Sequence, residues 1–208
     1  IPDEEGPCNL AGELSHPDKK PELPVRYIGF LSRFIQQQLP EKKDHLLLLL
    51  SGPEPQRSLL ENILITGLGD HNGTATFVRG LPGEPTLIPS TNRIHFYNHL
   101  PATELNKEMQ EASLIICRSG YSSIMDAMAL GKKCILVPTP GQTEQEYLGR
   151  SLMEKGIALT IPQKGFSLSG ALALAAAFNY AVPPAGNSTG LSKAVAALLH
   201  QLAGEALG

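Results

Sequence analysis

Residues 115–126, IICRSGYSSIMD, decide how this chain folds. The apolar residues predict a buried strand from Ser113 to Cys117, and a short polar turn and the first turns of a helix follow it. The first backbone amides of a helix have no partner within the helix, and the helix dipole is positive there, so this unit favours an anion. Asp126, further along the helix, is placed to meet hydroxyl groups of whatever carries the anion. A phosphate beside such a carboxylate indicates a nucleotide or a nucleotide-sugar.

From residue 45 onward, segments typical of strands and helices alternate. Residues 45–50 (HLLLLL) are a continuous apolar run, typical of a strand buried on both faces of a parallel sheet. Further strands are expected at residues 74–79, 93–97, 113–117, 134–138 and 158–161, and helices at 56–64, 102–112, 122–130, 143–155, 169–177 and 192–202. The alternation predicts an α/β fold, a Rossmann-like three-layer α/β/α parallel sheet with ligands at the C-terminal ends of its strands.

The composition narrows the class of protein. The chain has 208 residues, 42% of them hydrophobic and 18% charged, with a net charge of −3. These values are ordinary for a globular domain and make no electrostatic case for a nucleic-acid partner. Cys8, Cys117 and Cys134 lie far apart in the sequence, which argues against a zinc site or a disulfide framework. We therefore expect a cytoplasmic protein.

The beginning of the chain predicts an incomplete protein. The sequence starts with Ile1, all four Met residues are internal, and no signal peptide is visible. We expect residues 1–40 to be an arm or linker from a missing N-terminal domain, and residues 41–208 to be a nucleotide-sugar-binding domain with C-terminal helices. Within the arm we expect a short strand at residues 25–31 and the start of a helix at 30–38. No apolar run is long enough to span a membrane.

One glycine-rich segment imitates a dinucleotide-binding fingerprint. Residues 65–73, ITGLGDHNG, carry spaced glycines, but that fingerprint requires a strand before it and a helix after it. Here a helical pattern precedes the segment and a strand follows it. We interpret it as the turn at the end of a helix, and a Rossmann NAD site is not expected.

Three strand-to-loop junctions carry unusual polar density. In the first, Ser51 to Arg57, Gly52 allows close approach of the backbone to a ligand and Ser51 offers a hydroxyl; a turn stiffened by proline is the structural alternative. The second is Arg118 to Asp126, where the alternative makes Ser122 a helix cap and Asp126 a solvated helix residue. Three loops after three parallel strands meet at one sheet edge, and this convergence favours a ligand site.

The third junction, residues 137–147, is VPTPGQTEQEY. Thr143 and Glu146 fit a capping box, which explains two of its polar groups without a ligand. Capping does not explain Gln142, Glu144 and Gln145, whose amide and carboxylate groups suit the recognition of sugar hydroxyls.

The histidines do not indicate a metal site. His95 and His99 are four residues apart but fall on a strand and the loop after it, not on one helix face. His99 is of more interest as a loop residue at the same sheet edge as the three junctions.

These features resemble the C-terminal domain of family 28 glycosyltransferases of the GT-B fold. The shared residues are Arg118-Ser119-Gly120, Ser122-Ser123, Asp126, Ala127 to Gly131, Val137-Pro138 and Gln145-Glu146. The resemblance covers about residues 45–162, and the Ser51-Gly52 loop is similar to that family's glycine-rich turn. The segments LSGPEPQR (50–57) and PGQTEQ (140–145) are also similar to a group of predicted bacterial glycosyltransferases.

The resemblance implies a role for each part of the site. The diphosphate would lie at Gly120 to Ser123, Asp126 in place of the more usual Glu would hold the ribose, and the loop Asn98-His99-Leu100 would lie against the base. Gln145 and Glu146 would recognise the sugar; because the family's second Gln is Glu146 here, selectivity for N-acetylglucosamine does not follow. The expected donor-binding residues are Ser51, Gly52, Arg57, His99, Leu100, Arg118, Ser119, Gly120, Tyr121, Ser122, Ser123, Asp126, Gln142, Glu144, Gln145 and Glu146.

The implied function is that of the donor-binding domain of a glycosyltransferase, moving a sugar from a nucleoside-diphosphate sugar, expected to be a UDP-sugar, to an acceptor hydroxyl. The resemblance implies metal-independent, inverting transfer with no cofactor, because helix amides stabilise the leaving diphosphate. The acceptor and the catalytic base would come from the missing N-terminal domain, so we expect this fragment alone to be inactive. We expect no membrane span, with peripheral membrane association open to the full-length protein. The alternatives are a nucleotide-sugar hydrolase or 2-epimerase of the same fold, or a non-catalytic nucleotide-binding scaffold.

Overall fold

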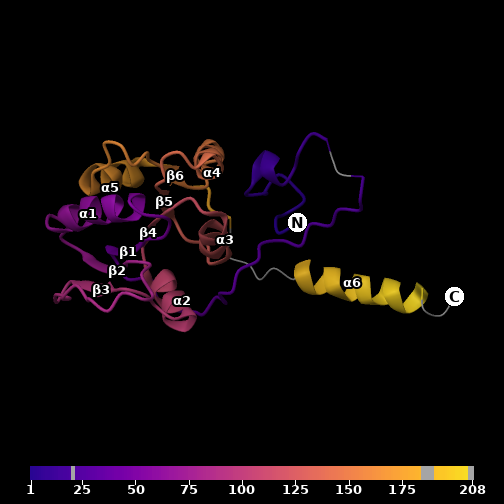
Figure 1. Cartoon of the computed structure of the whole chain (residues 1–208), viewed down its shortest axis with the longest axis horizontal. Helices are drawn as coiled ribbons and strands as arrows, with labels where there is room; N and C mark the ends of the chain where they lie inside the picture. The colour runs from indigo at the N-terminus through magenta and orange to yellow at the C-terminus, as the bar shows by residue number, and fades with distance from the viewer. Residues whose placement is uncertain (20–21, 184–189, 206–208) are drawn as a thin grey trace.

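The structure, a computed structural model, describes residues 1–19, 22–183 and 190–205. A six-stranded sheet forms its centre, with helices on both faces (Figure 1). The strands are β1 (His45–Leu49), β2 (Thr74–Val78), β3 (Ile94–Tyr97), β4 (Leu114–Cys117), β5 (Cys134–Leu136) and β6 (Leu159–Thr160). The helices are the 3₁₀ turn η1 (Gly12–Leu14), α1 (Gln56–Leu68), α2 (Ala102–Glu111), α3 (Tyr121–Ala129), α4 (Thr143–Glu154), α5 (Leu168–Ala177) and α6 (Gly190–Glu205).

The sheet is parallel and has the order β3-β2-β1-β4-β5-β6. This confirms the predicted Rossmann-like α/β fold. The chain moves outward from β1 to β2 and β3, and then returns to place β4 on the other side of β1. Ligands of such sheets bind where the strand order reverses, at the C-terminal ends of the strands. The junction of β1 and β4 is therefore the expected position of a site.

Alternating residues of the central strands supply two separate cores. Leu47 and Ile115 pack with α2, α3 and α4 on one face, whereas Leu46, Leu48 and Ile116 pack with α1 and α5 on the other. Strands covered on both faces need apolar residues at every position, which explains the run of leucines in β1. The two cores and the sheet between them are the predicted three layers.

The arm before β1 differs from its prediction. Residues 22–44 contain neither a helix nor a strand, so the expected strand at residues 25–31 and the expected helix at 30–38 are absent. Tertiary contacts hold this segment extended: Phe34 is buried in the core, and Asn106 Nδ2 on α2 donates to the Ile35 carbonyl at 3.0 Å. Burial against α2 thus overrides the local helical pattern.

The other predicted elements from residue 45 onward are present, with shifts at their ends. The glycine-rich segment 65–73 spans the end of α1 and the turn before β2, which confirms that it is not a dinucleotide-binding loop. Of the helices in the described ranges, none is long and apolar enough to cross a membrane.

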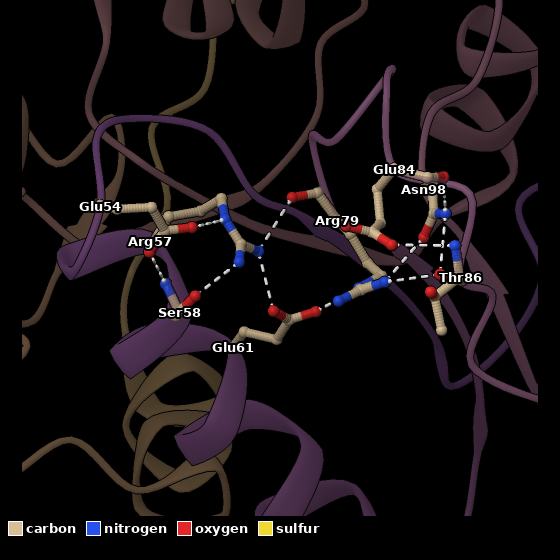
Figure 2. Close-up of polar contacts among 8 residues, drawn as sticks. All are labelled: Glu54, Arg57, Ser58, Glu61, Arg79, Glu84, Thr86 and Asn98. Carbon is tan, nitrogen blue, oxygen red and sulfur yellow. Dashed lines mark hydrogen bonds and ion pairs between the residues drawn. The ribbon is translucent and has the colours of Figure 1, made fainter.

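A buried ion-pair network holds the loops that follow β1, β2 and β3 (Figure 2). Glu61 of α1 lies between two guanidinium groups: Arg57 Nη1 donates to its Oε2 at 2.8 Å, and Arg79 Nε donates to its Oε1. Arg79 Nη1 also donates to Asn98 Oδ1 at 2.8 Å, and Arg57 Nε donates to Glu54 Oε1 at 2.6 Å. One chain of ion pairs and hydrogen bonds therefore joins the loop after β1 to the loop after β3.

Replacing Glu61 with Gln is expected to lower the free energy of unfolding by about 3–5 kcal/mol, because the buried guanidinium of Arg57 and the partly buried one of Arg79 lose the carboxylate between them. Urea denaturation at neutral pH measures the change. Glu54→Gln is the matched control: Glu54 contacts the same Arg57, but its side chain is 53% exposed, so its urea midpoint should stay close to the wild type. Equal shifts for the two variants would contradict a central role for Glu61.

A second buried cluster, at the opposite edge of the sheet, makes stability depend on pH. His45 Nε2 lies 3.6 Å from Glu108 Oε2, and the Thr76 hydroxyl donates to the same oxygen at 2.6 Å. The contact with His45 and then the bond from Thr76 lower the pKa of Glu108 to about 2. A carboxyl group with a lowered pKa stabilises the fold above its ordinary range, and this contribution is lost as the pH falls.

Glu108→Gln is therefore expected to reduce the free energy of unfolding at pH 7 by about 2 kcal/mol, less than the full pKa shift corresponds to, because water partly screens the group. The difference from the wild type should shrink as the pH falls from 4.5 toward 2, where Glu108 becomes protonated in the folded protein as well. Denaturant unfolding at several pH values measures this. Glu104→Gln, on the exposed side of α2, is the control; a difference that grows on acidification would refute the assignment.

Candidate functional site

The candidate site lies at the C-terminal ends of β1 and β4, where the order of the strands reverses. Gly52, in the loop after β1, has a φ of +101°, a conformation that favours glycine. Gly80 has a φ of +73°, and a Cβ there would lie 2.4 Å from the Leu50 carbonyl oxygen, so the loop after β2 crosses the end of β1 closely. Ser51 and Gly52 are exposed beside this crossing.

Helix α3 begins at this edge without a side-chain cap. Its N-cap is Gly120, and no side chain there accepts a hydrogen bond from the first turn. Ser122 is therefore not the cap, contrary to the structural alternative, because the helix starts one residue earlier at Tyr121. A Cβ on Gly120 would meet nothing within 4 Å, so there is open space in front of the helix. Uncapped amides facing open space can bind an anion.

The two predicted contact residues that directly follow β4 are buried. Arg118 is 1% exposed, and its guanidinium donates to the carbonyl oxygens of Val137 at 3.1 Å and Gln56 at 2.6 Å. Burial lowers its pKa to about 10. Ser119 is fully buried and donates to the Gln145 carbonyl at 2.8 Å. These side chains join the loops after β4 and β5 to the start of α1, and their burial argues against direct contact with a ligand.

Among the predicted contact residues near the ends of β1 and β3, some are buried or held in ion pairs and one is exposed. Arg57 is committed to the ion-pair network with Glu54 and Glu61 (Figure 2), and Leu100 is buried. His99 is exposed in the loop after β3. The network holds Asn98 immediately before it, so Arg57 contributes to the shape of this loop and His99 remains open to a ligand.

The start of α4 differs from the predicted capping box. The helix begins at Thr143, its N-cap is Gln142, and Glu146 Oε1 accepts from the Gly141 amide at 3.0 Å. Gln145 is turned toward its own loop, with Oε1 accepting from the Thr139 amide at 2.9 Å and Nε2 donating to Gln142 Oε1 at 2.5 Å. Glu144 is exposed. Gln145 thus shapes the loop, whereas Glu144 and Glu146 face solvent.

The arm contacts α3 at two positions that the sequence did not indicate. Ser32 Oγ donates to Asp126 Oδ1 at 2.7 Å, and Tyr121 Oη donates to the Pro2 carbonyl at 2.6 Å. Burial raises the pKa of Asp126, and the nearby Ser32 and Arg33 oppose that rise. Burial also raises the pKa of Tyr121. Asp126 is therefore not a freely solvated helix residue, and no local spacing pointed to its partner, 94 residues away.

Three buried polar atoms at this edge have no hydrogen-bond partner among the described residues: Arg118 Nε, Thr139 Oγ1 and Gln163 Oε1. Buried polar atoms normally have one. Thr139 Oγ1 lies 3.6 Å from the position of a Cβ on Gly52, so the loops after β1 and β5 are neighbours. Thr139 belongs to the third junction, where no role was predicted for it, and Gln163 lies outside all three junctions.

A cavity of about 490 Å³ lies between the arm and the starts of α3 and α4. Pro2 and Ser15 line it from the arm, and Tyr121, Thr143 and Glu144 line it from the helices. The site therefore combines an uncapped helix start, a half-buried carboxylate and a cavity with mainly apolar walls at one sheet edge.

Comparison with known proteins gives a family match. The model of the glycosyltransferase family 28 C-terminal domain matches residues 31–179. The chain is 36% identical over 114 residues to the UDP-N-acetylglucosamine–N-acetylmuramyl-(pentapeptide) pyrophosphoryl-undecaprenol N-acetylglucosamine transferase of Desulforudis audaxviator, covering 54% of this chain and 29% of that protein. The protein of the same name from Methylobacterium sp. is 26% identical over 162 residues, covering 75% of this chain and 39% of that protein.

Solved structures support the fold. The calicheamicin glycosyltransferase CalG4 gives a TM-score of 0.59 at 16% identity, covering 86% of this chain and 49% of that one. The glycosyltransferase of kitacinnamycin gives 0.56 at 16% identity, covering 80% and 45%. The chain spans less than half the length of each of these four proteins. Because the family model matches most of the described sheet and its helices, the chain belongs to glycosyltransferase family 28 and carries that family's C-terminal domain.

Proposed function

We propose that this chain is the donor-binding part of a glycosyltransferase that moves a sugar from a nucleoside-diphosphate sugar to an acceptor hydroxyl. The observation that carries the proposal is the uncapped start of α3, which faces open space where the strand order of the sheet reverses. The names of two curated relatives specify UDP-N-acetylglucosamine, so we propose uridine as the base.

The exposed residues of the site suit the parts of such a donor. The diphosphate would bind the amides from Gly120 to Ser123, with Ser51 and Gly52 on the opposite side. Asp126 would accept hydrogen bonds from ribose hydroxyls, and the base would lie against the loop that carries His99. Glu144 and Glu146 would contact the sugar, with Gln142 and Gln145 shaping that loop. Four buried residues would hold the loops of the site in place without touching the donor: Arg57, Leu100, Arg118 and Ser119.

The chemistry follows from the same arrangement. When the bond to the sugar breaks, negative charge develops on the departing diphosphate, and preorganised amides at a helix start stabilise it. We propose that the transfer is inverting and needs neither a metal nor a cofactor. The acceptor hydroxyl must also lose a proton to a base. We place that base and the acceptor site in residues outside this chain, and a cytoplasmic location with peripheral membrane association belongs to the same proposal.

A charge placed at the start of α3 tests the diphosphate site. Ser122→Asp is expected to weaken UDP binding about tenfold or more, because a carboxylate would face the phosphates. The same substitution should not destabilise the protein, since an acidic residue in the first turn favours a helix. Isothermal titration calorimetry measures the affinity, and thermal unfolding measures the stability.

Ser169→Asp is the matched control for this test. Ser169 occupies the same position in α5, one residue after the first of the helix, and it is also exposed. It lines a cavity with Asp44 and His71 at the opposite edge of the sheet. The affinity of the Ser169→Asp variant for UDP should equal that of the wild type. If the wild-type chain binds none of UDP, GDP, CMP and dTDP, or if both variants lose affinity equally, the proposed site is wrong.

Turnover separates transfer from the other reactions of this fold. We expect the 208-residue chain to show no transfer from UDP-N-acetylglucosamine, because we place the catalytic base outside it. A longer protein that contains this chain should consume the donor only when an acceptor is present, as measured by release of UDP. Free sugar or an epimer formed from the donor alone would instead identify a hydrolase or a 2-epimerase. Transfer by the 208 residues alone would contradict the placement of the base.

A further inference from the structure

The arm before β1 passes along α3 and reaches the carboxylate that the proposed function assigns to the ribose (Figure 1). Ser32 Oγ donates to Asp126 Oδ1 at 2.7 Å across 94 residues of sequence. At the first residue of the same helix, Tyr121 donates to the Pro2 carbonyl. The arm therefore contacts α3 at its start and again at Asp126.

The direction of the Ser32 hydroxyl is fixed by its second hydrogen bond. The Phe34 amide donates to Ser32 Oγ at 3.0 Å. A serine hydroxyl has one proton, and with an amide donating to its oxygen that proton is directed to Asp126. The bond from Ser32 therefore sets which oxygen of the carboxylate is occupied.

The segment that carries Ser32 is itself held firmly. Phe34 is 6% exposed and packs into the core formed with α2 and α3. On α2, Gln110 Oε1 accepts from the Gln37 amide at 2.5 Å, and Asn106 donates to the Ile35 carbonyl. These contacts on the C-terminal side of Ser32 make it a rigid support rather than a free loop residue.

Asp126 keeps capacity for a ligand. Its Oδ2 lies 3.9 Å from Arg33 Nε, beyond hydrogen-bond range, and its side chain is 14% exposed. An ionised carboxylate offers about four acceptor positions, so the bond from Ser32 leaves others for ligand hydroxyls. Burial raises the pKa of Asp126, whereas Ser32 and Arg33 favour its charged form. The Arg33 side chain is mainly exposed, so the Ser32 hydroxyl is the ordered side-chain partner of Asp126, and the backbone amide of Arg33 supports the same carboxylate.

We propose that Ser32 is a positioning residue, which orients Asp126 so that this carboxylate accepts hydrogen bonds from the ribose hydroxyls of the donor. This proposal rests on the proposed function. The arm thereby acts on the donor site indirectly: Ser32 holds Asp126 of α3, and Asp126 contacts the ligand. Without Ser32, Asp126 Oδ1 loses its hydroxyl donor, and the free oxygen of the carboxylate is less firmly directed.

Discrimination between ribose and deoxyribose tests the proposal. The ligands are UDP, 2′-deoxy-UDP and inorganic pyrophosphate, each titrated calorimetrically into the wild-type chain and Ser32→Ala. Ser32→Ala should lower the affinity for UDP about fivefold, the effect of one hydrogen bond, while the affinities for 2′-deoxy-UDP and pyrophosphate change much less. The ratio of the UDP and 2′-deoxy-UDP affinities therefore falls. A merely structural role would lower all three affinities together.

Two further variants guard against a folding defect. Ser32→Thr keeps the hydroxyl and should restore the ratio, whereas Gln36→Ala, at an exposed position of the arm, should leave it unchanged. In an Asp126→Asn background, Ser32→Ala should cause no further change in the ratio, because the two residues act as one unit. If Ser32→Ala lowers the ratio of UDP to 2′-deoxy-UDP affinity in the Asp126→Asn background as much as in the wild type, the proposal is overturned.

The outcomes separate the two proposals. If the wild-type chain binds UDP and Ser32→Ala leaves the UDP to 2′-deoxy-UDP ratio unchanged, the role of Ser32 is wrong and the donor site stands. If the wild-type chain binds neither nucleotide, the proposed function fails and the role of Ser32 fails with it.

Discussion

The buried guanidinium of Arg118 is the contact on which the candidate site depends. It donates to the backbone carbonyls of Val137 and Pro138 after β5 and of Gln56 at the start of α1, from its own position after β4. A buried cation is tolerated only when hydrogen bonds compensate it, and here they come from two segments far apart in the sequence. The carboxyl ends of β1, β4 and β5 are therefore held at a set distance around the open start of α3.

The other side of the site has an equivalent support. Glu61, between Arg57 and Arg79, links α1 to the loops after β2 and β3, and Arg79 in turn holds Asn98 beside the exposed His99 (Figure 2). The exposed residues of the site therefore rest on buried charged groups rather than on loop chemistry alone. Such support preorganises a binding site, because the loops do not have to become ordered when the ligand arrives.

The arm adds a third support of a different kind. Arg118 and Glu61 act on loops that belong to the sheet, whereas Ser32 acts on Asp126 from a segment that precedes the first strand. A carboxylate held in this way links donor binding to the path of the arm. In a longer protein, the arm would be the direct route by which residues before it could affect the donor site.

The sequence alone determined the layers, the parallel sheet and the edge where the site lies, because apolar periodicity and polar turns are local signals. The run of leucines at residues 45–50 and the turn at Arg118 to Gly120 were sufficient for this. The tertiary structure decided which polar residues face outward: Arg57, Arg118 and Gln145 turn into the protein. Helix α3 begins one residue before its predicted cap, Thr143 is the first residue of α4 rather than its cap, and the arm is extended. Partners for these groups come from segments brought together only by folding, and Ser32, 94 residues from Asp126, is the clearest case.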